Sequence, residues 1–107
     1  FNAIEKKIYE GVILDITVLN IDYIAQKQVK DLQEFLVLIN RVFQVVGGSN
    51  ETMGSALQIP NNDLEDNLQY ICAQKFKCDM IITNDKDFYS DSMMLMSSLD
   101  FIDKYLS

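Results

Sequence analysis

The stretch DLEDNLQYICAQKFKCDMIITNDKDF, residues 63–88, combines the clearest helix of the chain with a strand and an acidic turn. Apolar residues recur every three to four positions between residues 64 and 77, which predicts an amphipathic helix. Met80–Thr83 is aliphatic and ends in Thr, which predicts a strand. Asp85 and Asp87 follow directly. Carboxylates are therefore expected at the carboxyl end of a strand, where ligands gather in parallel sheets.

Strands and helices alternate along the rest of the chain, which predicts an α/β fold with a mostly parallel sheet. Three helix starts have a capping residue: Thr17, Asp31 with Glu34 as a capping box, and Ser49. The apolar face of the helix at 64–77 is expected to consist of Leu64, Leu68, Ile71, Cys72 and Phe76. The other expected strands cover 12–16, 42–46 and 93–96, and the other expected helices cover 2–10, 18–29, 32–41, 50–57 and 99–106.

Composition limits the possible functions of this 107-residue chain. Its net charge of −7 argues against a general nucleic-acid coat, but not against an enzyme that brings a divalent metal to nucleic acid. The absence of His excludes Ser-His and Cys-His catalysis, so any acid-base or metal chemistry rests on carboxylates. Two cysteines without a zinc pattern predict reduced thiols in a cytoplasmic protein, and no apolar run is long enough to span a membrane.

The four carboxylates of the opening stretch each have a structural and a functional interpretation. Asp63 precedes a helix, where an N-cap is its ordinary role. Asp66 lies in the first helical turn, where the helix dipole favours a negative charge and would also hold it ionised for a metal. Asp85 and Asp87 are turn formers or metal ligands. Two carboxylates from the turn and Asp66 from the helix start would suit Mg²⁺ or Mn²⁺, and repulsion should raise the pKa of at least one of the four.

The same stretch resembles the C-terminal signature of the PIN domain family. That signature has an Asp opening a helix, a small or apolar helix face, a short strand, Thr-x-Asp or Asn, and a closing Asp-Phe. Asp66–Ala73 fits the helix, Met80–Thr83 the strand and Thr83–Phe88 the end. VILDITVLNIDYIAQK is similar to the family's second strand and next helix, and MMLMSSLDFIDKYL to its last strand and closing helix. The resemblance implies a three-layer sandwich formed by a single PIN-like domain over residues 1–107.

PIN domains are mostly Mg²⁺- or Mn²⁺-dependent ribonucleases, and many bacterial members are VapC-type toxins held by an antitoxin. The resemblance therefore implies an endoribonuclease with RNA as substrate, an antitoxin protein as partner and a homodimer as a further expectation. It gives Asp66 and Asp85 the catalytic and metal-binding roles. It makes Asp63 and Asp87 further metal ligands, and it places Thr83 and Asn84 near the site. The metal would activate a water for in-line attack on an RNA phosphodiester.

Two positions depart from the family pattern. The family's first acidic residue ends an N-terminal strand that would precede Phe1, so we expect a domain truncated at its N-terminus and lacking that strand. The family's Glu in the following helix falls at Asn20, and Asp22 lies about 200° further around that helix. The alternative is therefore a catalytically degenerate PIN-like domain that binds a protein partner. A third hypothesis is an acidic α/β phosphotransfer module.

Overall fold

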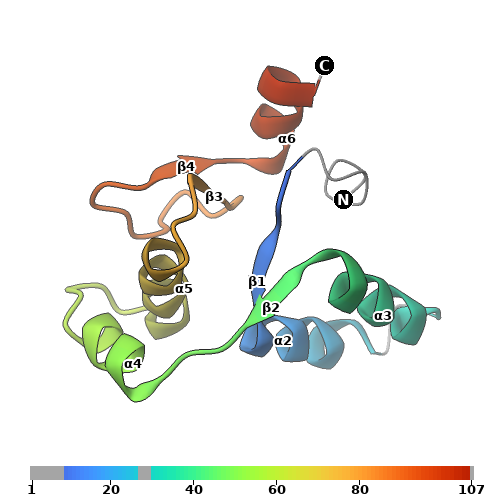
Figure 1. Ribbon diagram of the computed structural model, residues 1–107, viewed down its shortest axis with the longest axis horizontal. Helices are drawn as coiled ribbons and strands as arrows, with labels where there is room; N and C mark the ends of the chain where they lie inside the picture. Colours follow the sequence, from blue (N-terminus) through green and yellow to red (C-terminus); the bar gives the residue numbers. More distant parts are fainter. Residues whose placement is uncertain (1–8, 27–29, 107) are drawn as a thin grey trace. The chain divides into compact units, whose positions relative to one another are not determined.

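A computed structural model describes residues 9–26 and 30–106 and divides the chain into two compact units (Figure 1). The first unit covers Phe1–Gly47 and the second covers Gly48–Ser107. Each unit contains its own pair of parallel strands and its own helices. The acidic stretch that decides the sequence interpretation lies entirely within the second unit.

In the first unit, two helices connect two short parallel strands, as a parallel pairing requires. β1 (Val12–Leu14) is followed by α2 (Asp15–Ala25), α3 (Leu32–Val42) and β2 (Gln44–Val46). Figure 1 shows α2 and α3 lying side by side. The buried side chains come from the strand ends and from one face of α3: Leu14, Leu32, Ile39 and Val46.

Two expected caps in the first unit are wrong, although both helices exist. α2 begins at Asp15, ahead of Thr17, and shortens the expected strand because the Asp15 carboxylate accepts the backbone N–H of Ile16 at 2.7 Å. α3 begins after Asp31 as expected, but within the described residues the Asp31 side chain makes no capping hydrogen bond. Its backbone, at φ −103° and ψ 37°, lacks the extended conformation that an N-cap needs.

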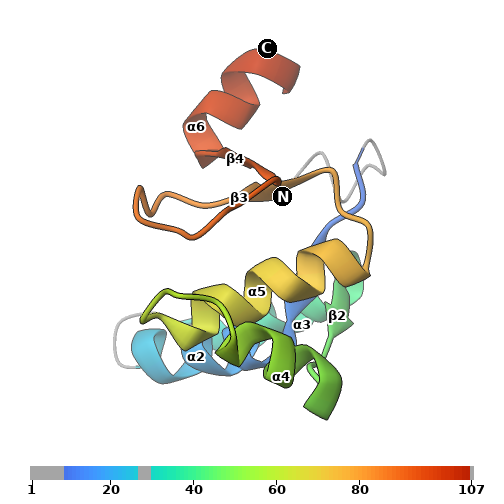
Figure 2. The same cartoon turned by 90° about the vertical axis from the view of Figure 1, so that its left-hand side faces the viewer.

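The second unit carries the remaining elements. α4 packs along α5, as Figure 2 shows, and β3 pairs in parallel with β4. Thr83 extends this pairing by one bond, because its N–H donates to the carbonyl of Met96 at 2.9 Å. The elements are α4 (Asn50–Leu57), α5 (Leu64–Lys75), β3 (Met80–Ile82), β4 (Met94–Met96), α6 (Ser98–Phe101) and the π-helical turn η1 (Ile102–Leu106).

The cap expected at Ser49 is confirmed, in the form of a reciprocal capping box. The Ser49 hydroxyl accepts the N–H of Thr52 at 3.3 Å, and the Thr52 hydroxyl accepts the N–H of Ser49 at 2.7 Å. Two N–H groups that the start of α4 would otherwise leave unpaired are thereby satisfied.

α5 ends in a left-handed turn that the sequence did not indicate. Lys77 has φ 58°, a conformation in which glycine is favoured. The N–H of Cys78 donates to the carbonyl of Ala73 at 2.9 Å, and the N–H of Lys77 donates to that of Gln74 at 3.1 Å. This pair of bonds is a Schellman motif. It reverses the chain and leads it directly into β3.

The apolar face expected for α5 is partly wrong. Leu68 and Cys72 are buried, but Leu64, the first residue of the helix, is 39% exposed. Tyr70 and Asn67 take interior positions in its place, with exposed fractions of 3% and 1%. The face that α5 buries is therefore rotated relative to the expected stripe and includes two polar side chains that need hydrogen-bond partners.

The class of the fold is confirmed: the protein is α/β, with short strands that pair in parallel. The three-layer sandwich, the single domain over residues 1–107 and the missing first strand concern both units and stay predictions. The helix expected at 2–10 falls largely outside the described residues, as do residues 27–29 of the helix expected at 18–29. Both cysteines are present as thiols, as expected. No helix in residues 9–26 and 30–106 has the length and apolar character needed to cross a bilayer.

Candidate functional site

The start of α5 places two of the predicted carboxylates side by side. Asp63 is the N-cap, and its Oδ1 accepts the backbone N–H of Asp66 at 3.1 Å. The structural role expected for Asp63 is therefore present. The carboxylate of Asp66 stands in the first helical turn, one position before the buried Asn67.

A pair of asparagines fixes the chain that enters this helix. The side-chain amide of Asn67 donates to the backbone carbonyl of Asn61, and the side-chain amide of Asn61 donates to Oδ1 of Asn67, both at 2.9 Å. Asn67 is nearly inaccessible to solvent, so these bonds satisfy a buried polar group. They hold the loop before α5 in one position and, with it, the capping Asp63.

The turn after β3 is built from its own polar side chains. The hydroxyl of Thr83 accepts the N–H of Asp85 at 3.1 Å, and Oδ1 of Asp85 accepts the N–H of Asp87 at 2.9 Å. The N–H of Phe88 donates to the carbonyl of Asp85, and the Phe88 side chain is buried below the turn. The turn-forming interpretation of Asp85 is thus present in the structure, and its carboxylate has a defined direction.

Asn84 connects this turn to the last part of the chain. Its Oδ1 accepts the N–H of Ser98 at 3.2 Å and lies 3.4 Å from the Ser98 hydroxyl, which donates to it. Ser98 is the first residue of α6. Thr83 therefore fixes the backbone of the turn that presents Asp85, and Asn84 connects that turn to the start of α6.

Electrostatic repulsion acts between the carboxylates at the start of α5 and the carboxylate in the turn after β3. The pKa of Asp66 is raised from 3.8 to about 6, first by burial and then by the negative charges of Asp63 and Asp85, with smaller contributions from Glu65 and from a hydrogen bond to Asp63. The raised pKa that the sequence predicted for at least one of the four carboxylates is confirmed at Asp66. Asp85, from a turn that follows β3, lies close enough to α5 for its charge to act on Asp66.

The side chains of this cluster offer only oxygen atoms as ligands, and hard divalent cations prefer oxygen ligands. Within the described residues, no group of three or more Asp, Glu or Cys side chains is arranged to hold a metal ion. Mg²⁺ is commonly bound through one or two carboxylates and keeps several waters, so Asp66 and Asp85 fit it in kind and in number. Asp87 is exposed in the same turn as Asp85.

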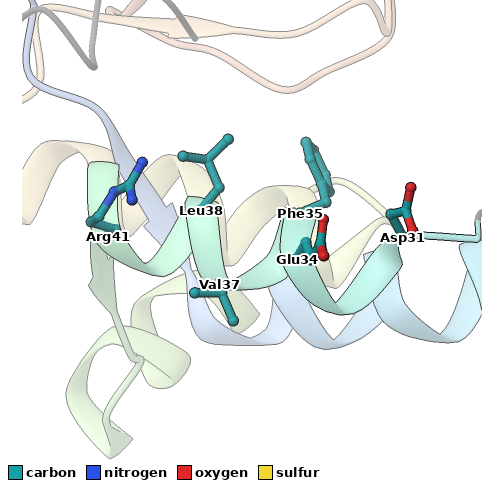
Figure 3. Close-up of a pocket in the computed structure, with 6 residues that line it drawn as sticks. All are labelled: Asp31, Glu34, Phe35, Val37, Leu38 and Arg41. Atoms are coloured by element: carbon teal, nitrogen blue, oxygen red, sulfur yellow. The ribbon is translucent and has the colours of Figure 1, made fainter.

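The remaining predicted residue, Asn20, belongs to α2 in the first unit and is half-buried. Geometry within the second unit does not test its role. The first unit also contains a shallow depression of about 440 Å³, lined only by residues of α3 and its N-cap. Figure 3 shows Phe35, Leu38 and Arg41 pointing to the same side of that helix. None of the predicted site residues lines this depression.

Comparison with known proteins gives one partial likeness. A 43-residue segment is 42% identical to part of Ribonuclease VapC1 from Aquifex aeolicus (strain VF5). The segment covers 40% of this chain and 30% of the relative, so the chain matches less than a third of that protein's length. No family model matches the chain, and no solved structure matches it. The likeness supports a relationship to VapC ribonucleases over that segment.

Sequence reasoning missed two residues that shape the site. Asn67 was overlooked because a polar residue beside Asp66 looks like part of a solvated face, although the preceding Asn61-Asn62 offered it a partner. Tyr70 was overlooked because it falls outside the expected apolar stripe of the helix, although its side chain is buried. The signal for Tyr70 was the Ser- and Asp-containing segment at 90–92, whose backbone needs an acceptor.

Proposed function

We propose that the protein is a metal-dependent endoribonuclease of the PIN type, acting as the toxin of a toxin-antitoxin pair. The observation that carries the proposal is the effect of Asp85 on the pKa of Asp66. These are the two carboxylates to which the PIN resemblance gives the catalytic role. The partial identity with Ribonuclease VapC1 supports the same reaction class.

In this proposal, Asp66 and Asp85 hold Mg²⁺ or Mn²⁺, with Asp63 and Asp87 as further oxygen donors. The bound metal supplies a nucleophilic water at neutral pH and positive charge for the phosphodiester. The chain itself orients the ligands: Thr83 fixes the backbone before Asp85, and Asp63 fixes the first turn of α5. The positive end of the α5 dipole favours the ionised form of Asp66, which a cation requires.

The test is cleavage of a fluorescently labelled RNA by the full-length protein, with Mn²⁺ or Mg²⁺ and with EDTA. We expect cleavage only with metal, and a fall of at least 100-fold in Asp66→Asn and in Asp85→Asn, as is typical when a group that binds the reacting metal is lost. Asp100→Asn is the matched control, since it removes an exposed carboxylate from the first turn of α6. Cleavage that survives EDTA, or that survives both site substitutions, would refute the proposal.

We further propose an antitoxin protein as the partner, a homodimer as the assembly and the cytoplasm as the location. A catalytically degenerate PIN-like domain that binds a protein is the second candidate, favoured by Asn20 at the family's Glu position and by the net charge of −7. The two candidates differ in the cleavage assay after the antitoxin is removed. Restored RNA cleavage identifies the ribonuclease, and continued inactivity with metal present identifies the binding module.

A further inference from the structure

Tyr70 stands one helical turn after Asp66 on the same side of α5, because residues four positions apart share a helix face. Its side chain is 3% exposed. Its hydroxyl oxygen accepts the backbone N–H of Ser92 at 3.1 Å and that of Asp91 at 3.3 Å. The side-chain amide of Gln74 donates to the same oxygen at 3.2 Å. One buried oxygen therefore accepts hydrogen bonds from both its own helix and the distant loop.

That loop, residues 83–93, connects β3 to β4 and begins with the acidic turn. Its first half is held by Thr83 and by the buried Phe88. Its second half is held by Tyr70, whose ring also meets the ring of Tyr89 edge-on, with centroids 5.2 Å apart and an interplanar angle of 87°. Tyr70 thus contacts the returning part of the loop through its ring and through its hydroxyl.

The hydroxyl has a role that a phenylalanine could not fill. The Tyr70 hydroxyl and the Ser92 hydroxyl also lie 3.3 Å apart and share a hydrogen bond. The hydrogen bond with the Ser92 side chain lowers the pKa of Tyr70, burial opposes it, and the backbone N–H groups of Ser92 and Asp91 lower it further. Removing the oxygen would leave the N–H groups of Asp91 and Ser92 without their acceptor, and water would then compete for them.

We propose that Tyr70 is a positioning residue of the carboxylate site, an inference that rests on the proposed metal-dependent function. α5 carries Asp66 on its first turn. On the next turn it carries Tyr70, which holds the loop at residues 83–93. One helix therefore carries both Asp66 and the side chain that holds the second half of the loop containing Asp85. Tyr70 touches neither substrate nor metal, and it acts by holding the loop through which Asp85 approaches Asp66.

The test is the affinity of the full-length protein for Mn²⁺, measured by electron paramagnetic resonance, together with amide hydrogen exchange without metal. Tyr70→Phe should weaken Mn²⁺ binding at least fivefold and speed exchange at Asp91 and Ser92. Two controls separate positioning from stability. Ile71→Val trims a half-buried neighbour on the same helix and should lower stability while leaving the Tyr70 hydroxyl in place, and Tyr23→Phe removes the hydroxyl of a 79% exposed tyrosine. Both should bind Mn²⁺ as the wild type does.

The outcomes distinguish this inference from the proposed function. If the wild type binds Mn²⁺ and Tyr70→Phe binds it equally well, the positioning role is wrong and the proposed function stands. If Ile71→Val weakens binding as much as Tyr70→Phe does, general destabilisation explains the effect and the positioning role is again wrong. If the wild type binds no Mn²⁺, the proposed function fails and the inference fails with it.

Discussion

Replacing Asp66 with Asn should make the protein more stable at neutral pH. The folded protein holds the pKa of Asp66 at about 6, above its ordinary value of 3.8. The folded state therefore binds this proton more tightly than the unfolded state does. The resulting stabilisation is complete below pH 3.8 and is lost as the pH rises through about 6. Above that pH the ionised carboxylate destabilises the fold, and the neutral amide of Asn does not.

The size of the effect follows from the shift. A change of about two pH units corresponds to about 3 kcal/mol at 1.36 kcal/mol per unit. Because Asp66 is only partly buried, solvent screening reduces this to about 1 kcal/mol. The helix dipole works in the opposite direction, since it favours the ionised form by roughly 0.3–1 kcal/mol, but the raised pKa shows that burial and repulsion outweigh it. A gain of about 1 kcal/mol corresponds to roughly 4–8 °C in Tm for a small domain.

Thermal unfolding of both forms between about pH 4 and pH 8, followed by circular dichroism, measures this difference. The Tm gain of Asp66→Asn should be largest near pH 8 and should vanish near pH 4. Glu51→Gln is the matched control, since it removes an exposed carboxylate from the first turn of α4 and should give no pH-dependent gain. Mn²⁺ should raise the Tm of the wild type and leave that of Asp66→Asn unchanged. A Tm difference independent of pH, or one shared by Glu51→Gln, would show that ionisation of Asp66 does not control the stability of the fold.

Three further predictions concern stability measured by urea unfolding. Lys77→Gly should stabilise the protein by about 1 kcal/mol, because φ 58° is strained for Lys and relaxed for Gly; a loss of stability would contradict the assigned turn. Asn67→Ala should cost about 2–3 kcal/mol, since it leaves the side-chain amide and the backbone carbonyl of the half-buried Asn61 without these partners; a cost below about 0.5 kcal/mol would show that water replaces the bonds. Ser49→Ala should cost about 1 kcal/mol through the lost capping box, and Ser49→Asp should restore most of it.

The helices and strands were largely predictable because their signals are local. Apolar periodicity places α5 correctly, and Ser49 caps α4 as expected. The cap at Thr17 failed because Asp15 already satisfies an N–H at the start of α2, and neighbouring polar residues compete for the same role. The left-handed turn at Lys77 carries no local signal, since the residue usually found there is Gly.

The raised pKa of Asp66 was predictable from the sequence, whereas the side chains that support the carboxylates were not. Asp66 and Asp85 were chosen because they match acidic positions of the PIN signature, and the charge of Asp85 does act on Asp66. Tyr70 and Asn67 support that arrangement through contacts with residues 91–92 and 61. The bonds of Tyr70 join positions more than twenty residues apart and depend on how the loop folds, so no spacing rule reveals them.

Turn formation and metal binding need not exclude each other in these carboxylates. Asp63 and Asp85 each use one oxygen to accept a nearby backbone N–H, so cap and turn chemistry explains both residues without a ligand. The same bonds fix the directions of two negative charges beside Asp66 and raise its pKa. That repulsion does not stabilise the cap or the turn. A divalent cation would relieve the repulsion, and the clustered negative charge would strengthen its binding. The helix dipole alone does not offset the burial and repulsion that raise the pKa of Asp66, and the metal hypothesis depends on this residue.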